Sequence, residues 1–313
     1  MAPPRARAFS FEDIENFDDE ALRTFLDPHA SGVDPADIAA ALHGLSPALR
    51  HRVDDALPDA ARRQFRRSHG PWSPRSIALA RRRVVDELFW PLLYWNSPDE
   101  YEDLVAGEYI HPRVFDLVDL DGRVVCDIGA GSGRFTIPAS RRARRVIAVD
   151  AVPALLRRLE DKAHRNHIAN IEFRRGAFAA LPLADGSVDV AVACSAFTSE
   201  PSQGAERAIA EAERVVRESG EVVVIWPDDP NWFRARGFVH LSLRGNDVHH
   251  FPDLTTAERI CDAFYSPAAA EWVRRTGSAD VPYQILGVPP PSDVCVKRVT
   301  DPRNPLPAPI PSR

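Results

Sequence analysis

An apolar segment runs directly into three glycines spaced two residues apart, and few folds accept such a sequence. The segment is VVCDIGAGSGRF, residues 124–135, in which Gly129, Gly131 and Gly133 follow the apolar residues. Glycine lets a chain turn sharply and lets backbone N–H groups approach a ligand with no Cβ in the way. The sequence therefore predicts a strand, then a ligand-binding loop, then a helix that starts near Phe135.

Apolar and helical segments alternate along the chain from residue 123 onward. Besides VVCDIG, the strand-like segments are RVIAVD, NIEFRRG, VDVAVACS and EVVVIWP. Continuous apolar runs separated by helices are typical of a parallel sheet covered on both faces. Two more strands are expected at 282–287 and 293–299. The short loop VPPPS between them predicts an antiparallel hairpin at the end of the sheet, because a parallel crossover needs about a dozen residues.

An acidic residue at the end of the second strand agrees with a nucleoside-binding loop. Asp150 ends the segment RVIAVD, where a carboxylate can accept hydrogen bonds from ribose hydroxyls. Enzymes that use nicotinamide nucleotides and enzymes that use S-adenosylmethionine share this arrangement. The dinucleotide fingerprint GxGxxG needs a small residue at position 134, where this chain has Arg134. The spacing GxGxG, with Asp127 two places before the first glycine, favours S-adenosylmethionine.

The first part of the chain carries a recurring signal for the start of a helix. A small polar or acidic residue precedes proline at several points: Asp34-Pro35, Ser46-Pro47, Ser73-Pro74 and Ser97-Pro98. Serine and aspartate suit the N-cap, and proline suits the first helical turn, where its missing N–H is not needed. We therefore expect an all-α module over residues 9–90 and a helical bridge or lid over 91–121. The proline-rich segment 301–313 is predicted to be disordered.

Composition and charge argue against several classes of protein. A net charge of −6 and an isoelectric point near 5.9 disfavour a chain that coats nucleic acid or an anionic membrane. The four cysteines are scattered and form no CxxC pair, so neither a disulfide framework nor a structural metal site is expected. No apolar run is long enough for a secretory signal or a membrane span. We expect a cytoplasmic protein with no membrane partner and no metal.

The N-terminal helices resemble the C-terminal domain of the flagellar motor switch protein FliG. The resemblance rests on LHGL at residues 42–45 with a P.LR helix start after it, on the Ala60-Ala61 pair, and on the Gly70-Pro71 turn before a long helix. It implies a scaffold that docks a protein partner through residues 9–90. Arginines replace the acidic charges that the family turns toward the motor's stator, so we expect docking rather than torque: Arg63, Arg66 and Arg67.

These arginines belong to a longer basic stretch between residues 62 and 83 that contains no acidic residue. We interpret it as a solvated helix face or a docking surface, with contact to nucleic acid as the alternative. The end of the fourth strand lacks the Pro-Pro-aromatic element of methylases that act on exocyclic base amines. Nucleic acid is therefore an unlikely partner.

Residues from about 105 to 299 are similar to the class I S-adenosylmethionine-dependent methyltransferases, particularly the small-molecule kind called type 11. The shared motifs are YIHPRVFDLVDL, the glycine loop, LPLADGSVDVAVACSAF and AIAEAERVVRESGEVVVIWP. The resemblance implies a doubly wound, Rossmann-like α/β domain with a seven-stranded sheet over residues 122–300, preceded by the small all-α domain.

The same resemblance implies a set of cofactor contacts: Asp127, Gly129, Ala130, Gly131, Gly133, Asp150, Ala151, Ala177, Phe178 and Cys194. The glycine loop would line the methionine portion, with Asp127 supporting the loop and the amino group. Asp150 would bind the ribose, and Ala177 with Phe178 would flank the adenine. The segment after the third strand has no carboxylate for the adenine amine, so stacking and backbone contacts are expected there.

Other residues have a simpler interpretation beside a catalytic one. Asp189 is expected to be a structural acid at the start of a strand, and Cys194 a small buried thiol rather than a nucleophile. His249 and His250 could supply a general base for a substrate oxygen, but an exposed pair in a loop is the commoner case. His111 is expected to be structural or to pack on the glycine loop.

We therefore expect methyl transfer from S-adenosylmethionine to a small-molecule acceptor through an oxygen, nitrogen or carbon nucleophile. The acceptor pocket would be walled by the bridge 91–121, the loop 195–204 and the insertion 228–265. Two alternatives stay open. One is a catalytically silent interaction or scaffold protein that uses the FliG-like helices, and the other is an oxidoreductase that binds NAD.

Overall fold

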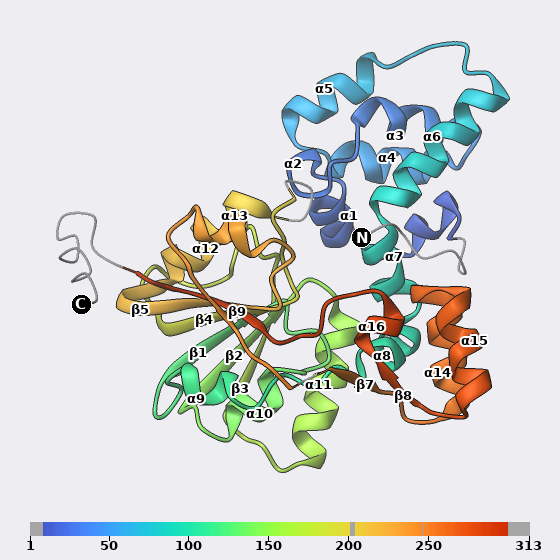
Figure 1. The fold of residues 1–313 in the computed structure, drawn as a ribbon. Helices are drawn as coiled ribbons and strands as arrows, with labels where there is room; N and C mark the ends of the chain where they lie inside the picture. Colours follow the sequence, from blue (N-terminus) through green and yellow to red (C-terminus); the bar gives the residue numbers. More distant parts are fainter. Residues whose placement is uncertain (1–8, 201–203, 246, 300–313) are drawn as a thin grey trace.

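The computed structural model describes residues 9–200, 204–245 and 247–299. Its central element is a seven-stranded sheet with the order β3-β2-β1-β4-β5-β9-β6 (Figure 1). Parallel pairing joins the strands predicted from the apolar runs: β1 (Val124–Ile128), β2 (Arg145–Asp150), β3 (Ile171–Arg175), β4 (Val188–Cys194) and β5 (Val216–Ile225). The strand order reverses between β1 and β4, which places the ligand crevice of such a sheet at their carboxyl ends.

Helices cover both faces of this sheet, as the predicted doubly wound fold requires. One face packs against three helices: α9 (Val114–Leu117), α10 (Thr136–Ser140) and α11 (Pro153–Arg165). The other face packs against α12 (Ala205–Val215) and α13 (Pro230–Arg234). Successive residues of a strand point to opposite faces, so Val125 belongs to the first apolar cluster and Cys126 to the second.

The antiparallel end of the sheet forms, but one predicted strand is a helix. β9 (Asp293–Arg298) pairs antiparallel with β5 and with β6 (Val239–Ser242). The prediction of a strand at 282–287 is wrong, because the chain leaves β8 (Asp280–Pro282) and continues as α16 (Tyr283–Leu286). A short apolar run suits either element, and the burial of Tyr283 and Leu286 fixes the helix. β8 pairs instead with β7 (Val248–His250) in a second, two-stranded sheet.

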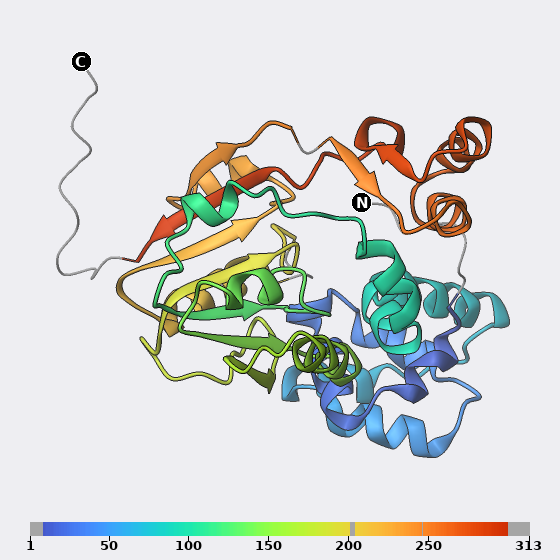
Figure 2. The same cartoon turned by 90° about the horizontal axis from the view of Figure 1, so that it is seen from below.

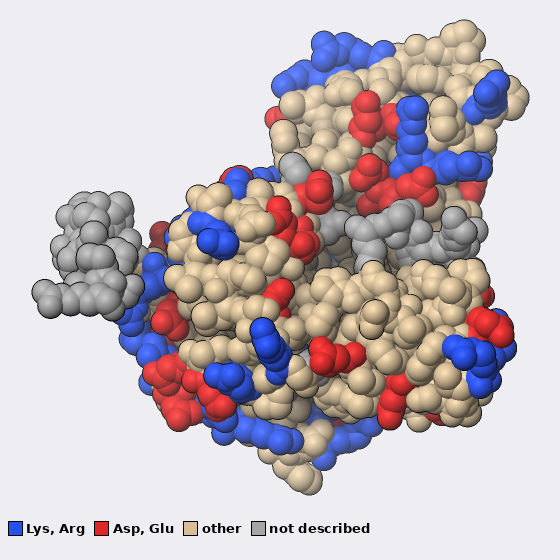
Figure 3. All heavy atoms as spheres, in the orientation of Figure 1, with Lys and Arg blue, Asp and Glu red and all other residues tan. Residues whose placement is uncertain are grey.

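The helix starts predicted from proline are confirmed. The N-terminal helices are η1, a 3₁₀ helix (Phe11–Asn16), α1 (Asp19–Phe25), α2 (Pro28–Ser31), α3 (Pro35–Ala41), α4 (Pro47–Ala56), α5 (Asp59–Arg67) and α6 (Pro74–Glu87). Asp34 caps α3 by accepting the Ala36 N–H at 2.8 Å. Arginine side chains gather over α5 at the outer end of these helices (Figure 3). This gathering includes part of the basic stretch read in the sequence.

One hydrophobic core joins the N-terminal helices to later parts of the chain. It continues through α7 (Phe89–Asn96) and α8 (Pro98–Val105) into a C-terminal group of helices: α14 (Leu254–Ile260), the π-helical turn η3 (Cys261–Tyr265), α15 (Pro267–Thr276) and α16. Figure 2 shows α8 where these two groups of helices meet the sheet. Among the helices of the described residues, none has the length and apolar character needed to cross a membrane.

Candidate functional site

The glycine loop lies between β1 and α10 and adopts a backbone that only glycine takes easily. Gly129, Gly131 and Gly133 have φ angles of 68°, 54° and 98°, which lie in the left-handed region where a Cβ is strained. A Cβ on Gly129 would lie 2.5 Å from the Cβ of Ala196. The loop therefore needs glycine both for its turn and for its close contact with the segment after β4.

 Asp127 lies in β1, two residues before Gly129, and one of its carboxylate oxygens has no hydrogen-bond partner among the described residues. Thr136 donates its hydroxyl to Asp127 Oδ2, whereas Oδ1 is the buried oxygen without a partner. Burial raises the pKa of this carboxyl to about 7, and the negative charge of Asp150 adds to the rise, against the hydrogen bond from Thr136. A buried oxygen with free lone pairs is suited to a ligand that brings an N–H donor or a positive charge.

Asp150 ends β2 and holds the glycine loop in place. Its Oδ2 accepts the Gly131 N–H at 2.8 Å, and its Oδ1 accepts the Val152 N–H at 2.8 Å. Burial raises the pKa of Asp150, although these backbone donors oppose the rise. Because a carboxylate oxygen can accept more than one hydrogen bond, Asp150 keeps capacity for ribose hydroxyls.

A narrow pocket lies at the carboxyl ends of β1 and β4, where the strand order reverses. It is lined by Tyr101, Val105, Asp127, Gly129, Ala130, Ser132, Arg134, Phe135 and Cys194. The structure thus brings together Asp127, Gly129, Ala130 and Cys194 of the predicted contacts. Helix α8 covers the pocket, because the Tyr101 hydroxyl lies 2.9 Å from the position that a Cβ on Gly131 would take.

Arg134 and Glu108 form an ion pair beside this pocket. Arg134 also donates to the Cys194 carbonyl at 3.3 Å, and its guanidinium lies 5.9 Å from the centre of the Trp226 ring. Burial raises the pKa of Glu108, and Arg134 opposes that rise. The ion pair holds the residues just before α10 against the segment that follows α8.

Cys194 ends β4 at the pocket, and its thiol is partly buried and free. Burial raises the pKa of the thiol to about 11, so it is protonated at neutral pH and is a poor nucleophile. This agrees with a packed thiol rather than a catalytic one. The next residue, Ser195, has a φ of 54°, which turns the chain sharply away from the strand.

The predicted adenine contacts lie outside this pocket. Ala177 forms a bridge with Ala180, and the Phe178 ring lies 6.4 Å from that of Phe197. Gly133 also lies apart from the lining residues, and a Cβ there would collide with Leu159. Ala151 follows Asp150 and supplies it with a backbone hydrogen bond.

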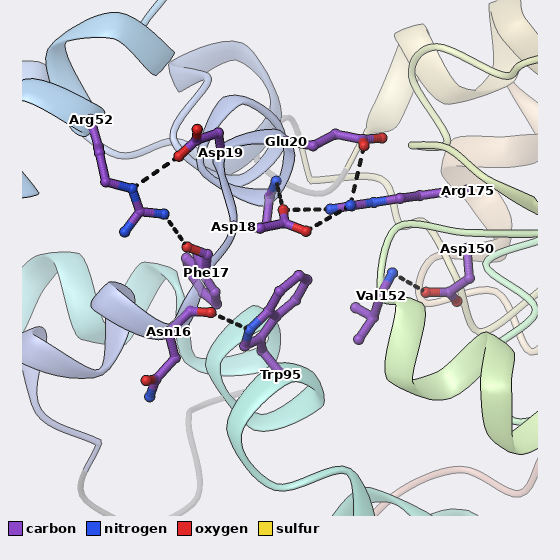
Figure 4. A network of polar contacts seen from close by, with 11 residues as sticks. Asn16, Phe17, Asp18, Asp19, Glu20, Arg52, Trp95, Asp150, Val152 and Arg175 are labelled. Atoms are coloured by element: carbon purple, nitrogen blue, oxygen red, sulfur yellow. Dashed lines mark hydrogen bonds and ion pairs between the residues drawn. The ribbon is translucent and has the colours of Figure 1, made fainter.

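Arg175 ends β3 and contacts the N-terminal helices (Figure 4). Its guanidinium donates to both carboxylate oxygens of Asp18 at 2.7 Å and lies 3.1 Å from Glu20. Trp95 of α7 lies under the same guanidinium, at 5.8 Å, and donates to the Asn16 carbonyl. The segment that lacks an adenine carboxylate therefore holds the helical module against the sheet.

Two residues with expected structural roles have them. Asp189 accepts the Val124 N–H at 2.7 Å and pairs with Arg217 at 2.6 Å. His111 is buried and its Nε2 lies 2.9 Å from the Arg244 carbonyl oxygen. These contacts tie strands and loops together and leave neither side chain at the pocket.

The expectation of an exposed histidine pair is wrong for one of its members. His250 is exposed and lies 2.8 Å from Asp280, but His249 is fully buried. The two residues follow each other in β7, so their side chains point to opposite faces, and only one face is open to water.

Sequence reasoning missed several residues of the site: Tyr101, Glu108, Arg134 and Tyr283. The aromatic and acidic composition of residues 91–121 was the one available signal for the first two. In the sequence, Arg134 stands out only as a departure from a dinucleotide fingerprint, and the pattern around Tyr283 predicts a strand. Their meeting depends on the packing of α8 and α16, which local patterns do not reveal.

Two family models match separate parts of the chain. Residues 125–220 match the model described as a methyltransferase domain, and residues 4–88 match that of the FliG C-terminal domain. The first match contains the glycine loop and strands β1 to β4. The second covers the N-terminal helices, in agreement with the resemblance read from the sequence.

Known proteins each resemble a part of the chain. It is 30% identical to an arsenite methyltransferase of Halobacterium salinarum over 36% of this chain and 29% of that protein. It is 40% identical to a 23S rRNA uracil methyltransferase, RlmD, of Alcanivorax borkumensis over 20% of this chain and 14% of that protein. The chain thus spans less than a third of the length of either relative.

The solved structure of the YcgJ protein from Bacillus subtilis is 15% identical to the chain, with a TM-score of 0.41 over 64% of this chain and 98% of that one. The family models are more specific about identity than this likeness in fold. By those models, residues 125–220 are similar to a methyltransferase domain, and residues 4–88, which precede them, are similar to a FliG C-terminal domain.

Proposed function

We propose that the chain is an S-adenosylmethionine-dependent methyltransferase that acts on a small-molecule acceptor. The observation that carries this proposal is the free, buried Oδ1 of Asp127 at a loop of left-handed glycines. The methyltransferase family match over residues 125–220 supports it. An ammonium group near Oδ1 would give the oxygen its missing partner and favour the ionised carboxylate.

The residues around the loop fit the rest of the cofactor. Asp150 would accept hydrogen bonds from the ribose hydroxyls with the lone pairs that Gly131 and Val152 leave free. Ala177 and Phe178 would flank the adenine, beyond Ala151. When bound, S-adenosylmethionine supplies an electrophilic methyl group on a sulfonium, which an acceptor attacks in line.

Binding needs a movement of α8. The Tyr101 hydroxyl lies against Gly131, in the space where the methionine portion would run. We therefore propose that α8 withdraws from the loop when the cofactor enters and closes over it afterwards. A closed α8 would exclude water and hold the reactants together, which are the main contributions that a methyltransferase makes.

A small molecule is the acceptor class that best suits this chain. The net charge of −6 gives no long-range attraction for the phosphates of RNA, which dominate protein affinity for nucleic acid. One relative is named for methylation of ribosomal RNA and another for methylation of arsenite. The two names differ in acceptor, and each likeness covers at most 36% of this chain, so neither name fixes the acceptor.

A catalytically silent scaffold is the second candidate. The narrowness of the covered pocket and the use of Arg175 to hold the helical module favour it. In that case residues 9–90 would dock a protein partner and the sheet would support them. The two candidates differ in whether the glycine loop binds the cofactor.

Isothermal titration of the full chain with S-adenosylmethionine, S-adenosylhomocysteine and NAD distinguishes them. We expect micromolar binding of the first two ligands, none of NAD, and loss of binding in Asp150→Ala and Asp127→Asn. Asp119→Ala is the matched control, because this exposed carboxylate pairs only locally with Arg123. No binding of either sulfur ligand at millimolar concentration, with a normal thermal transition, would support the scaffold.

A further inference from the structure

Two neighbouring side chains, His249 of β7 and Tyr283 at the start of α16, are buried with polar atoms that have no partner among the described residues. His249 has no exposed surface, and Tyr283 is 2% exposed. Both ring nitrogens of His249 and the hydroxyl of Tyr283 lack a hydrogen-bond partner among the described residues. A buried polar atom without a partner is unfavourable, and native proteins keep few of them.

Ring contacts connect these two residues to the candidate cofactor pocket. Their rings meet edge to face with centres 5.9 Å apart, and Tyr283 meets Trp226 in the same way at 6.2 Å. Trp226 in turn lies under the Arg134 guanidinium, and Arg134 lines the pocket. A chain of ring contacts therefore leads from the glycine loop to the unpartnered atoms.

The backbone near His249 and Tyr283 lies close to their side chains and to that of Trp226. Trp226 directly follows β5 and has a φ of 57°, a strained conformation for a bulky residue that is found mostly at functional sites. Gly107 lies against the imidazole, since a Cβ there would come within 2.6 Å of His249 Cδ2. The bridge that covers the glycine loop thus also bounds His249.

We propose that His249 and Tyr283 form the recognition end of the acceptor pocket, where they bind an uncharged, planar molecule through its hydroxyl group. This inference rests on the proposed methyltransferase function. It goes further by assigning the acceptor class and the residues that select it.

A hydroxyl group is the ligand that satisfies both residues. A neutral imidazole has one donor and one acceptor nitrogen, and a tyrosine hydroxyl both donates and accepts. Burial lowers the pKa of His249 to about 4, and the charges of His250 and Arg134 add to the effect, so the ring is neutral at pH 7. A ligand hydroxyl can donate to one partner and accept from the other.

The surroundings argue against a charged ligand and for a flat one. Arg134 would repel a cation and Glu108 would repel an anion, while the two together are close to neutral. The neighbouring side chains are aromatic: Phe251 stacks on His249 with ring centres 4.0 Å apart, and Trp226 contacts Tyr283. Aromatic side chains of this kind favour a ligand with an extended flat face.

The test is a calorimetric titration of the full chain, saturated with S-adenosylhomocysteine, with 5-hydroxyindole, indole and 4-hydroxybenzoate. We expect 5-hydroxyindole to bind more tightly than indole, which lacks the hydroxyl, and than the anionic 4-hydroxybenzoate. His249→Phe and Tyr283→Phe should each weaken 5-hydroxyindole binding about tenfold, the effect of losing one buried hydrogen bond, and leave indole binding unchanged. Tyr109→Phe, at an exposed tyrosine, should change neither.

Thermal unfolding of the same variants without ligand supplies an independent readout. Because the Tyr283 hydroxyl has no partner to lose, Tyr283→Phe should keep or raise the transition temperature. A clear drop would show that the hydroxyl is a structural hydrogen-bond group and would overturn the inference. Equal affinity for 5-hydroxyindole and indole, or no binding of 5-hydroxyindole, would also overturn it. Failure of S-adenosylhomocysteine itself to bind would instead reject the proposed function.

Discussion

Asp127 is the residue through which pH acts on the candidate cofactor site. The glycine motif predicted an acid at this position, and the structure adds that one oxygen is buried without a partner. Burial and the neighbouring Asp150 raise the pKa of Asp127 to about 7. The free protein therefore holds a proton on this carboxyl below pH 7, where an isolated aspartate would be ionised.

Cofactor affinity should rise with pH through this range. An ammonium group pairs with the ionised carboxylate, so binding releases the proton that the free protein holds below pH 7. Below that pH, affinity for S-adenosylhomocysteine should fall by up to about tenfold per pH unit. Titrations at pH 5.5, 7 and 8 in two buffers of different ionisation enthalpy measure both the affinity and the proton release. Proton uptake, or no pH dependence, would contradict the assignment.

Substitutions at two glycines with similar φ angles can distinguish a loss of folding stability from a loss of cofactor binding. Gly131 and Gly122 have φ angles of 54° and 69°, but only a Cβ on Gly131 meets another group, Tyr101, at 2.9 Å. Either substitution by alanine should cost about 1–2 kcal/mol of unfolding free energy, measured in urea. Only Gly131→Ala should also weaken S-adenosylhomocysteine binding, by at least about tenfold. Equal binding by the two variants would show that the loop is not the cofactor site.

At the scale of elements, α8 is held closed by ion pairs on two sides. Asp99 and Glu102 pair with residues of α11, and Asp103 pairs with Arg259 of α14. Since α8 must withdraw before the cofactor enters, contacts that stabilise the closed state reduce the apparent affinity. The stability of the closed position of α8 thus controls the access of the cofactor to the glycine loop.

Weakening these pairs should strengthen cofactor binding. The double variant Asp99→Asn, Glu102→Gln removes the charges that face α11. Asp99 is exposed and Glu102 is half-buried, and ion pairs near the surface are worth about 0.2–1 kcal/mol each. Apparent affinity for S-adenosylhomocysteine should rise about two- to tenfold, as measured by calorimetry. Glu87→Gln is a control on α6, outside the pocket. A fall in affinity in the double variant would mean that closed α8 is required for entry.

The elements were predictable where local signals and tertiary packing agree. The apolar runs predicted the parallel strands, and proline after a capping residue predicted the helix starts. The prediction of a strand at residues 282–287 was wrong because a run such as PYQILG fits a strand or a helix. The burial of Tyr283 decides between the two elements. The lining of the pocket was predicted only in part, because tertiary packing decides it too: the approach of Tyr101 to Gly131 depends on how α8 packs.

At the scale of the whole molecule, Arg175 links the helical module to the sheet. It pairs with Asp18 and Glu20, and the side chains of Arg175 and Asp18 are 25% and 46% exposed. Solvent therefore screens the interaction, and its contribution to stability is modest. A separate apolar core joins the N-terminal helices to α7, α8 and the C-terminal helices.

A double-mutant cycle on this pair should reveal a small coupling. Arg175→Ala, Asp18→Ala and the double variant should give a coupling of about 0.5–1 kcal/mol in urea unfolding. The exposed pair Arg123–Asp119, which lies within one segment, is the control and should give less. A coupling of zero for Arg175 and Asp18 would mean that this ion pair does not help to hold the module.

The central claim is that the glycine loop and its two acids bind S-adenosylmethionine. A crystal structure of the full chain with S-adenosylhomocysteine tests it most directly. We expect the amino group at Asp127 Oδ1, the ribose hydroxyls at Asp150, and Tyr101 displaced from Gly131. A complex in which the ligand lies elsewhere, or crystals soaked at saturation in which Tyr101 still covers an empty loop, would contradict the account.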